Sequence, residues 1–175
     1  MKLHPPTFVN QADSVFAETL ANSGFVTDGE DHEDDWHVCR RYRAGDRYIE
    51  ITADCHFRDG EPECRLILGH GSNEWPECDW NKIALWRIKG SGANYPFRSS
   101  DGIPKLLRTM LSELQHHAHD FLSGDLERFF DARAVQSRER EPIKTYSPQP
   151  DGSYKTTIDP VTQALKDRYS NPNAW

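Results

Sequence analysis

Residues 36–57, WHVCRRYRAGDRYIEITADCHF, contain the pattern that decides the fold. Gly45-Asp46 has the composition of a two-residue β-turn, in which Gly takes a position with positive φ. Counting outward from this turn gives the facing pairs Ala44/Arg47, Tyr42/Ile49, Arg41/Glu50 and His37/Asp54. Opposite charges face each other in two of these pairs, so the sequence predicts an antiparallel hairpin with a defined register.

The same register separates apolar from polar side chains, because alternate residues of a strand point to opposite faces. The apolar face contains Trp36, Val38, Tyr42, Ile49, Ile51, Ala53 and Cys55. Arg40 is the exception, since it falls on this face opposite Ile51. A buried arginine needs a carboxylate partner or marks a groove. Because buried charges are usually paired, we predict a structural ion pair in preference to a ligand contact.

The rest of the chain alternates helical and extended patterns. We predict helices over 11–23, 103–122, 126–138 and 160–169, a third strand over 64–68 and a strand over 83–86. Pro142, Pro148 and Pro150 indicate an irregular connection over 140–158. Asp159-Pro160 has the residue types of an N-cap and first helical position. The predicted fold is a single α+β domain over residues 1–175, with helices packed on one face of an antiparallel sheet of three to five strands.

Composition limits the possible functions. The 175 residues carry a formal net charge of −7, which argues against general nucleic-acid binding because that affinity depends on Lys and Arg. No apolar run approaches the length of a membrane span, and the N-terminus lacks the apolar centre of a signal peptide. We therefore expect a cytoplasmic protein without membrane contact. The four cysteines form no Cys-x-x-Cys motif, so reduced thiols in or near the core are expected.

An acidic run lies just before the hairpin. Its carboxylates are Asp28, Glu30, Asp31, Glu33, Asp34 and Asp35. So many carboxylates in eight residues repel one another, which predicts an exposed, mobile loop. Two interpretations are open: the loop recognises a basic protein partner, or it serves solubility alone.

The polar face of the hairpin is a candidate ligand site. It is rich in groups that can bind a small ligand, and we select His37, Arg41 and Glu50 together with Arg40. Cross-strand charge pairing explains much of this face without a ligand. Cys39 also falls on this face, where we expect a partly exposed thiol.

A histidine-rich segment at 116–120 is the candidate metal site. His116 lies on the same predicted helix face as His119 and Asp120, at the three- and four-residue spacing that brings side chains together. This face points away from the apolar stripe of Leu107, Met110 and Leu114, so we expect His116 and His119 to be exposed. A catalytic metal needs a third ligand and a shielded cavity, so this site needs another segment or subunit to complete it. No nucleotide-binding or catalytic motif is present, and we expect no cofactor.

In size, charge and expected α+β layout the chain resembles small acidic bacterial immunity proteins. The resemblance extends to these general properties and to no motif, and it implies a non-enzymatic protein that binds a basic partner such as a nuclease. The first hypothesis is therefore an acidic binding protein. The alternatives are a metal-binding module or metal-dependent hydrolase using the His116/His119/Asp120 cluster, and a small-ligand binder using the polar hairpin face.

Overall fold

The central hairpin has the predicted register. In the computed structural model, which describes residues 4–33, 36–55 and 61–173, β2 (His37–Ala44) pairs with β3 (Arg47–Asp54). The observed pairs include Ala44/Arg47, Tyr42/Ile49, Arg41/Glu50 and His37/Asp54. Gly45 has a φ of 61°, as the turn requires. The apolar face of this hairpin belongs to the hydrophobic core, as predicted.

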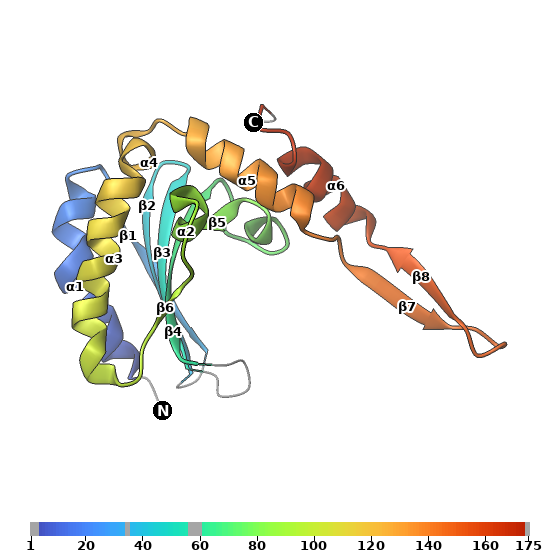
Figure 1. The fold of residues 1–175 in the computed structure, drawn as a ribbon, viewed down its shortest axis with the longest axis horizontal. Helices are drawn as coiled ribbons and strands as arrows, with labels where there is room; N and C mark the ends of the chain where they lie inside the picture. The colour runs from blue at the N-terminus through green and yellow to red at the C-terminus, as the bar shows by residue number, and fades with distance from the viewer. Residues whose placement is uncertain (1–3, 34–35, 56–60, 174–175) are drawn as a thin grey trace.

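The hairpin lies in the middle of an antiparallel sheet (Figure 1). The order along the sheet is β1 (Val26–Glu33), β2, β3, β4 (Glu63–His70) and β5 (Lys82–Ala84), and the short β6 (Tyr95–Pro96) also pairs with β4. The predicted third strand is therefore confirmed as β4. The segment 83–86, predicted as a strand, is divided between β5 and α2 (Leu85–Lys89).

Two long helices cover one face of this sheet (Figure 1). They are α1 (Pro5–Ala21) and α3 (Ile103–His117). Phe16 and Leu20 of α1, and Leu107, Met110 and Leu114 of α3, are buried in one core with the sheet. This arrangement confirms the predicted α+β fold with helices on one face.

The predicted helix over 103–122 is interrupted. Ala118 has a φ of −127° and ψ of 31°, so α3 ends at His117 and the short α4 (His119–Ser123) follows. Ala118 is fully buried, and Phe121 of α4 also belongs to the core. The next helix, α5 (Glu127–Glu139), and the last, α6 (Pro160–Tyr169), match the prediction within one or two residues. Asp159 caps α6 by accepting a hydrogen bond from the Thr162 backbone N–H at 2.8 Å.

The second face of the sheet is also covered. Residues 71–81, which contain the 3-10 turn Glu77–Asp79, fold against it. Tyr48 and Glu50 on this face are buried, and the Tyr48 hydroxyl donates to Asn81 Oδ1 at 2.7 Å. Another 3-10 turn, Ser100–Gly102, leads into α3. None of the helices in the described part of the chain is long and apolar enough to cross a membrane.

Residues 140–158 differ from the prediction. Instead of an irregular connection, they contain a second hairpin, formed by β7 (Lys144–Pro148) and β8 (Tyr154–Ile158). The prolines that suggested irregular structure lie before this hairpin, at the end of β7 and in the turn. We refer to residues 143–159 as the arm.

Candidate functional site

The arm projects from the rest of the molecule (Figure 1). Its two strands pair only with each other among the described residues. Every residue of β8 is exposed, and β7 has the same character from Thr145 to Pro148. A two-stranded hairpin alone is marginally stable in water, because it has no core to cover it. The arm therefore contributes nothing to the core and is available for contact with another molecule.

The base of the arm is fixed to the body. Asp159 N–H donates to the Ile143 carbonyl at 2.9 Å, and Ile143 N–H donates to Thr162 Oγ1 at 3.0 Å. Thr162 belongs to α6 and is buried. On the body side, α6 is held by an ion pair between Arg168 and Glu77 at 3.3 Å. The position of the arm is thus set by α6 and by the turn at Glu77.

The two faces of the arm differ in chemistry. The pairs Lys144/Ile158, Tyr146/Thr156 and Pro148/Tyr154 place six side chains on one face, which we call the aromatic face. The opposite face has Thr145/Thr157 and Ser147/Lys155 and is polar. Tyr146 is 60% exposed and Tyr154 is 68% exposed. Aromatic side chains in such a position offer large contact areas at low entropic cost.

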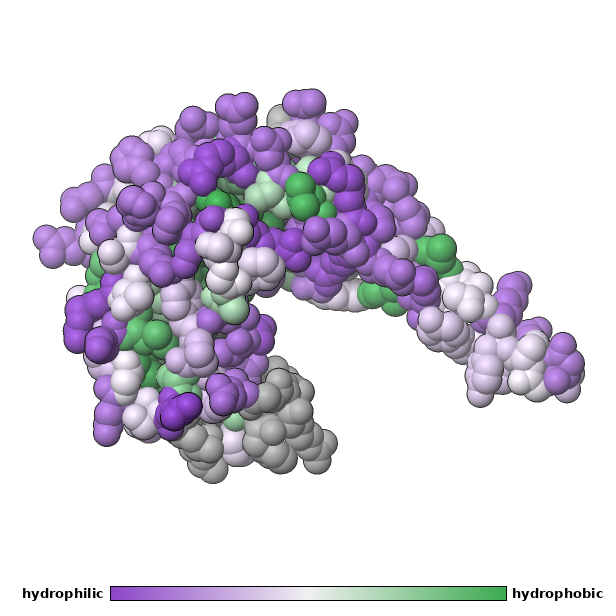
Figure 2. All heavy atoms as spheres, in the orientation of Figure 1, coloured by the Kyte–Doolittle hydropathy of each residue, from purple (hydrophilic) through white to green (hydrophobic). Residues whose placement is uncertain are grey.

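Exposed apolar residues concentrate on the arm and its base. Five of the eight large hydrophobic residues found exposed in the described chain lie within 143–161: Ile143, Tyr146, Tyr154, Ile158 and Val161. Figure 2 shows the arm mainly in pale colours with hydrophobic residues near its base, whereas much of the visible body surface is strongly hydrophilic. Clustered exposed apolar residues mark interaction sites more often than isolated ones do.

The face predicted to bind a small ligand is not open. Glu50 is 4% exposed and its carboxylate lies between Arg41 at 3.0 Å and Lys82 at 3.2 Å. His37 lies 3.9 Å from Asp54. Cys39, predicted to be partly exposed, is buried. The expectation of a partly exposed Cys39 was wrong because the sequence did not indicate that residues 71–81 fold over this face. Ligand binding at Arg40, Arg41, His37 and Glu50 stays a prediction.

Arg40 forms the predicted structural ion pair. Its Nε and Nη2 donate to the two carboxylate oxygens of Asp13 at 2.8 and 2.7 Å. Asp13 belongs to α1, so this pair connects the helix layer to the sheet.

The acidic run is not a loop over most of its length. Residues up to Glu33 form β1, with Asp28 and Gly29 at a bulge. Arg43 Nε donates to Asp28 Oδ2 at 2.7 Å, and Arg40 Nη1 donates to the Gly29 carbonyl at 3.4 Å. The backbone of Glu30, Asp31 and Glu33 lies in this edge strand, whereas Asp34 and Asp35 lie outside the described residues. The loop prediction was wrong because pairing with β2 brings arginines close to the acidic strand.

The histidine-rich segment has the predicted exposure. His116 and His119 are both exposed, and they belong to different helices because of the break at Ala118. The Asp120 carboxylate accepts from the Phe121 N–H at 3.1 Å and pairs with Arg128 at 3.3 Å. Within residues 4–33, 36–55 and 61–173, no three His, Cys, Asp or Glu side chains are arranged to hold a metal ion. Completion of this site by another subunit stays a prediction.

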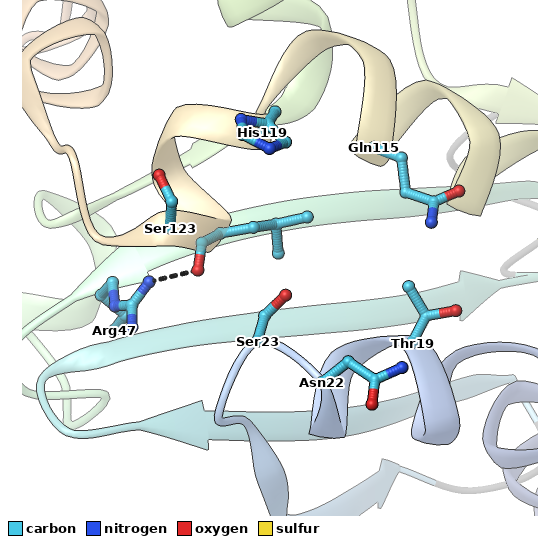
Figure 3. Close-up of a pocket in the computed structure, with 8 residues that line it drawn as sticks. Thr19, Asn22, Ser23, Arg47, Gln115, His119 and Ser123 are labelled. Atoms are coloured by element: carbon cyan, nitrogen blue, oxygen red, sulfur yellow. Dashed lines mark hydrogen bonds between the residues drawn. The ribbon is translucent and has the colours of Figure 1, made fainter.

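A polar pocket of about 570 Å³ lies beside these residues (Figure 3). Thr19, Asn22 and Ser23 from the end of α1 face Gln115, His119 and Ser123 across it. Arg47 Nη1 donates to the backbone carbonyls of Phe121 and Leu122 at 2.6 and 2.8 Å. The Arg47 guanidinium thereby anchors the end of α4 to β3. These hydrogen bonds have a structural role and do not indicate a ligand in the pocket.

The sequence contains a signal for the arm that the prediction of an irregular connection overlooked. Asp151-Gly152 lies between two segments rich in Thr and Tyr, which is a hairpin pattern. Gly152 has a φ of 82°. Comparisons with protein-family models, curated proteins and solved structures found no match to this chain, so its function has to be inferred from its own geometry.

Proposed function

We propose that this chain is a non-enzymatic binding protein that docks a protein partner on the arm. The observation that carries the proposal is the exposed aromatic face of a hairpin whose strands pair with nothing else in the described chain. Strand addition and aromatic anchoring are common ways of binding a protein. The fixed base supports this role, because an arm that is already positioned loses less entropy on binding.

The test compares two double variants on the two faces of the arm. Tyr146→Ser with Tyr154→Ser removes the aromatic anchors, whereas Thr145→Ser with Thr157→Ser changes the polar face as the matched control. Each chain is immobilised and exposed to an extract of the native host, and retained proteins are identified. We expect a partner that is retained by the unaltered chain and the control but lost from the aromatic-face variant. If no retained protein depends on the aromatic face, the proposal is wrong.

A second candidate function is recognition of a basic protein by the acidic strand β1. It is favoured by the position of β1 at the edge of the main sheet, paired on one side by β2 alone among the described residues. Charge complementarity raises association rates mainly at low salt. Replacing Asp28, Glu30, Asp31 and Glu33 by Asn or Gln should then slow association with a basic partner several-fold, and an unchanged rate would exclude this candidate.

A further inference from the structure

Within the described residues, the two outer edges of the arm present backbone groups that no further strand pairs with. Asp159 N–H donates to Ile143 O, and Gln149 N–H donates to Ser153 O. In an antiparallel ladder, directly bonded pairs alternate with pairs whose N–H and C=O point outward. The outward pairs are therefore Lys144/Ile158, Tyr146/Thr156 and Pro148/Tyr154. These six residues are the same ones that form the aromatic face.

The two edges differ in their capacity to pair. The edge of β7 includes Lys144 and Pro148, and Pro148 has no N–H. Lysine and proline on an exposed edge strand commonly prevent it from pairing with another chain. The edge of β8 presents Tyr154, Thr156 and Ile158, which all have an N–H and carry no charge. Lys155 of β8 has its backbone directed inward, toward Ser147. The open edge of the arm is therefore β8.

We propose that two copies of this chain associate by antiparallel pairing of β8 with β8, about a two-fold axis at Thr156. The pairing rests on the proposed function and makes the partner a second copy of the chain. Thr156 faces its equivalent, Tyr154 faces Ile158 of the second copy, and Lys155 faces Thr157 of the second copy. The apolar residues stand at equal distances on either side of Thr156, so the strand is complementary to itself.

The pairing extends the arm into a four-stranded sheet with a continuous aromatic face. Thr156 and its equivalent exchange two backbone hydrogen bonds, and so do Tyr154 and Ile158 of the second copy, whereas the Lys155/Thr157 pair between them is not hydrogen-bonded. The charged lysines do not face each other, and the two acidic bodies lie at opposite ends of the new sheet because each arm projects from its body (Figure 1). The contact is smaller than a standard interface of about 1,600 Å², so we expect a dissociation constant on the order of 10–100 µM.

Sedimentation over a concentration series from about 5 to 500 µM tests the pairing. The unaltered chain should change from monomer to dimer across this range. Thr156→Pro removes one outward N–H without breaking a bond inside the arm, and it should weaken association at least about tenfold. Thr156→Val keeps the backbone donor and should dimerise normally. A chain that stays monomeric throughout, or a dimer that T156P leaves intact, would overturn the pairing.

Disulfide trapping tests the register. Facing Cα atoms in a directly bonded pair lie about 5.5 Å apart, within the range that a disulfide spans. Thr156→Cys should therefore form a covalent dimer under mild oxidation, whereas Thr157→Cys, one position along β8, should not. Equal trapping of both variants would contradict the register. A monomeric chain that still binds another protein through the aromatic face refutes the pairing and leaves the proposed function intact. A monomeric chain that binds no protein through the aromatic face refutes both the pairing and the proposed function.

Discussion

Arg40 and Asp13 join the sheet to its helical layer through two parallel hydrogen bonds of 2.8 and 2.7 Å. The Tyr42 hydroxyl donates to the same carboxylate at 2.6 Å. Asp13 is therefore the shared acceptor for an arginine and a buried tyrosine that lie two residues apart in β2. Such charge-assisted, bidentate contacts are stronger than ordinary surface ion pairs.

Asp13→Ala should lower the free energy of unfolding by about 2 kcal/mol, because it removes the acceptor of the buried Tyr42 hydroxyl as well as the ion pair. Glu18→Ala changes an exposed carboxylate on the same helix and should cost less than about 0.5 kcal/mol. Urea unfolding of the two variants measures both values. Equal stability of the two would show that the contact is energetically unimportant.

Gly69 is required by the ring of Tyr48. A Cβ on residue 69 would lie 2.0 Å from Tyr48 Cζ, far inside van der Waals contact. Tyr48 is fully buried, so the ring has no room to move away. We expect Gly69→Ala to cost about 3 kcal/mol or more, measured by thermal or urea unfolding. Gly102→Ala, where a Cβ would meet nothing, is the control and should be close to neutral. A mild effect of G69A would contradict the observed packing.

The buried tyrosines make the protein sensitive to high pH. Burial is the main cause that raises the pKa of Tyr48 above its ordinary value, and it likewise raises the pKa of Tyr169 to about 12. The unfolded chain loses these protons from about pH 10, while the folded chain retains them. Stability contributed by the neutral hydroxyls is thus complete below pH 10 and falls as the pH rises further.

We therefore expect the urea midpoint to decrease between about pH 10 and pH 11.5, and Tyr48→Phe to reduce the steepness of that decrease. Urea titrations at closely spaced pH values measure the slope for both chains. The Phe variant starts from a lower stability because Asn81 loses its hydrogen-bond donor, but only the slope is compared. Identical slopes would show that Tyr48 does not retain its proton in the folded protein.

The central hairpin could be predicted because two separate patterns agreed on one register. Apolar alternation and the Arg41/Glu50 and His37/Asp54 pairs point to the same turn at Gly45. The apolar stripe of Leu107, Met110 and Leu114 likewise predicted α3 and the side of it that is buried. Burial of Glu50 could not be predicted, because it depends on residues 71–81 folding back over a polar face, and no local pattern specifies that long-range contact.

Acidic composition was misleading for residues 28–33, which form most of β1. Charge repulsion disfavours a compact arrangement of carboxylates, but an edge strand leaves room for solvent and brings Arg43 within 2.7 Å of Asp28. The three prolines at 142, 148 and 150 indicated an irregular connection, but none of them removes a hydrogen bond inside the ladder of β7 and β8. Pro148 lies at an outward position, where its missing N–H costs nothing in the arm itself.

Removal of the arm alone tests its proposed role most directly. The Asp159 N–H donates to the Ile143 carbonyl, which is the hydrogen bond that closes a two-residue turn, so Asn-Gly can replace residues 144–158. Because most of the removed residues are exposed and none is buried, the melting temperature should stay within about 3 °C of the original. Sedimentation and partner retention are then measured on the shortened chain. We predict a folded monomer that retains no partner, whereas a folded, shortened chain that associates as strongly as before would contradict the role of the arm.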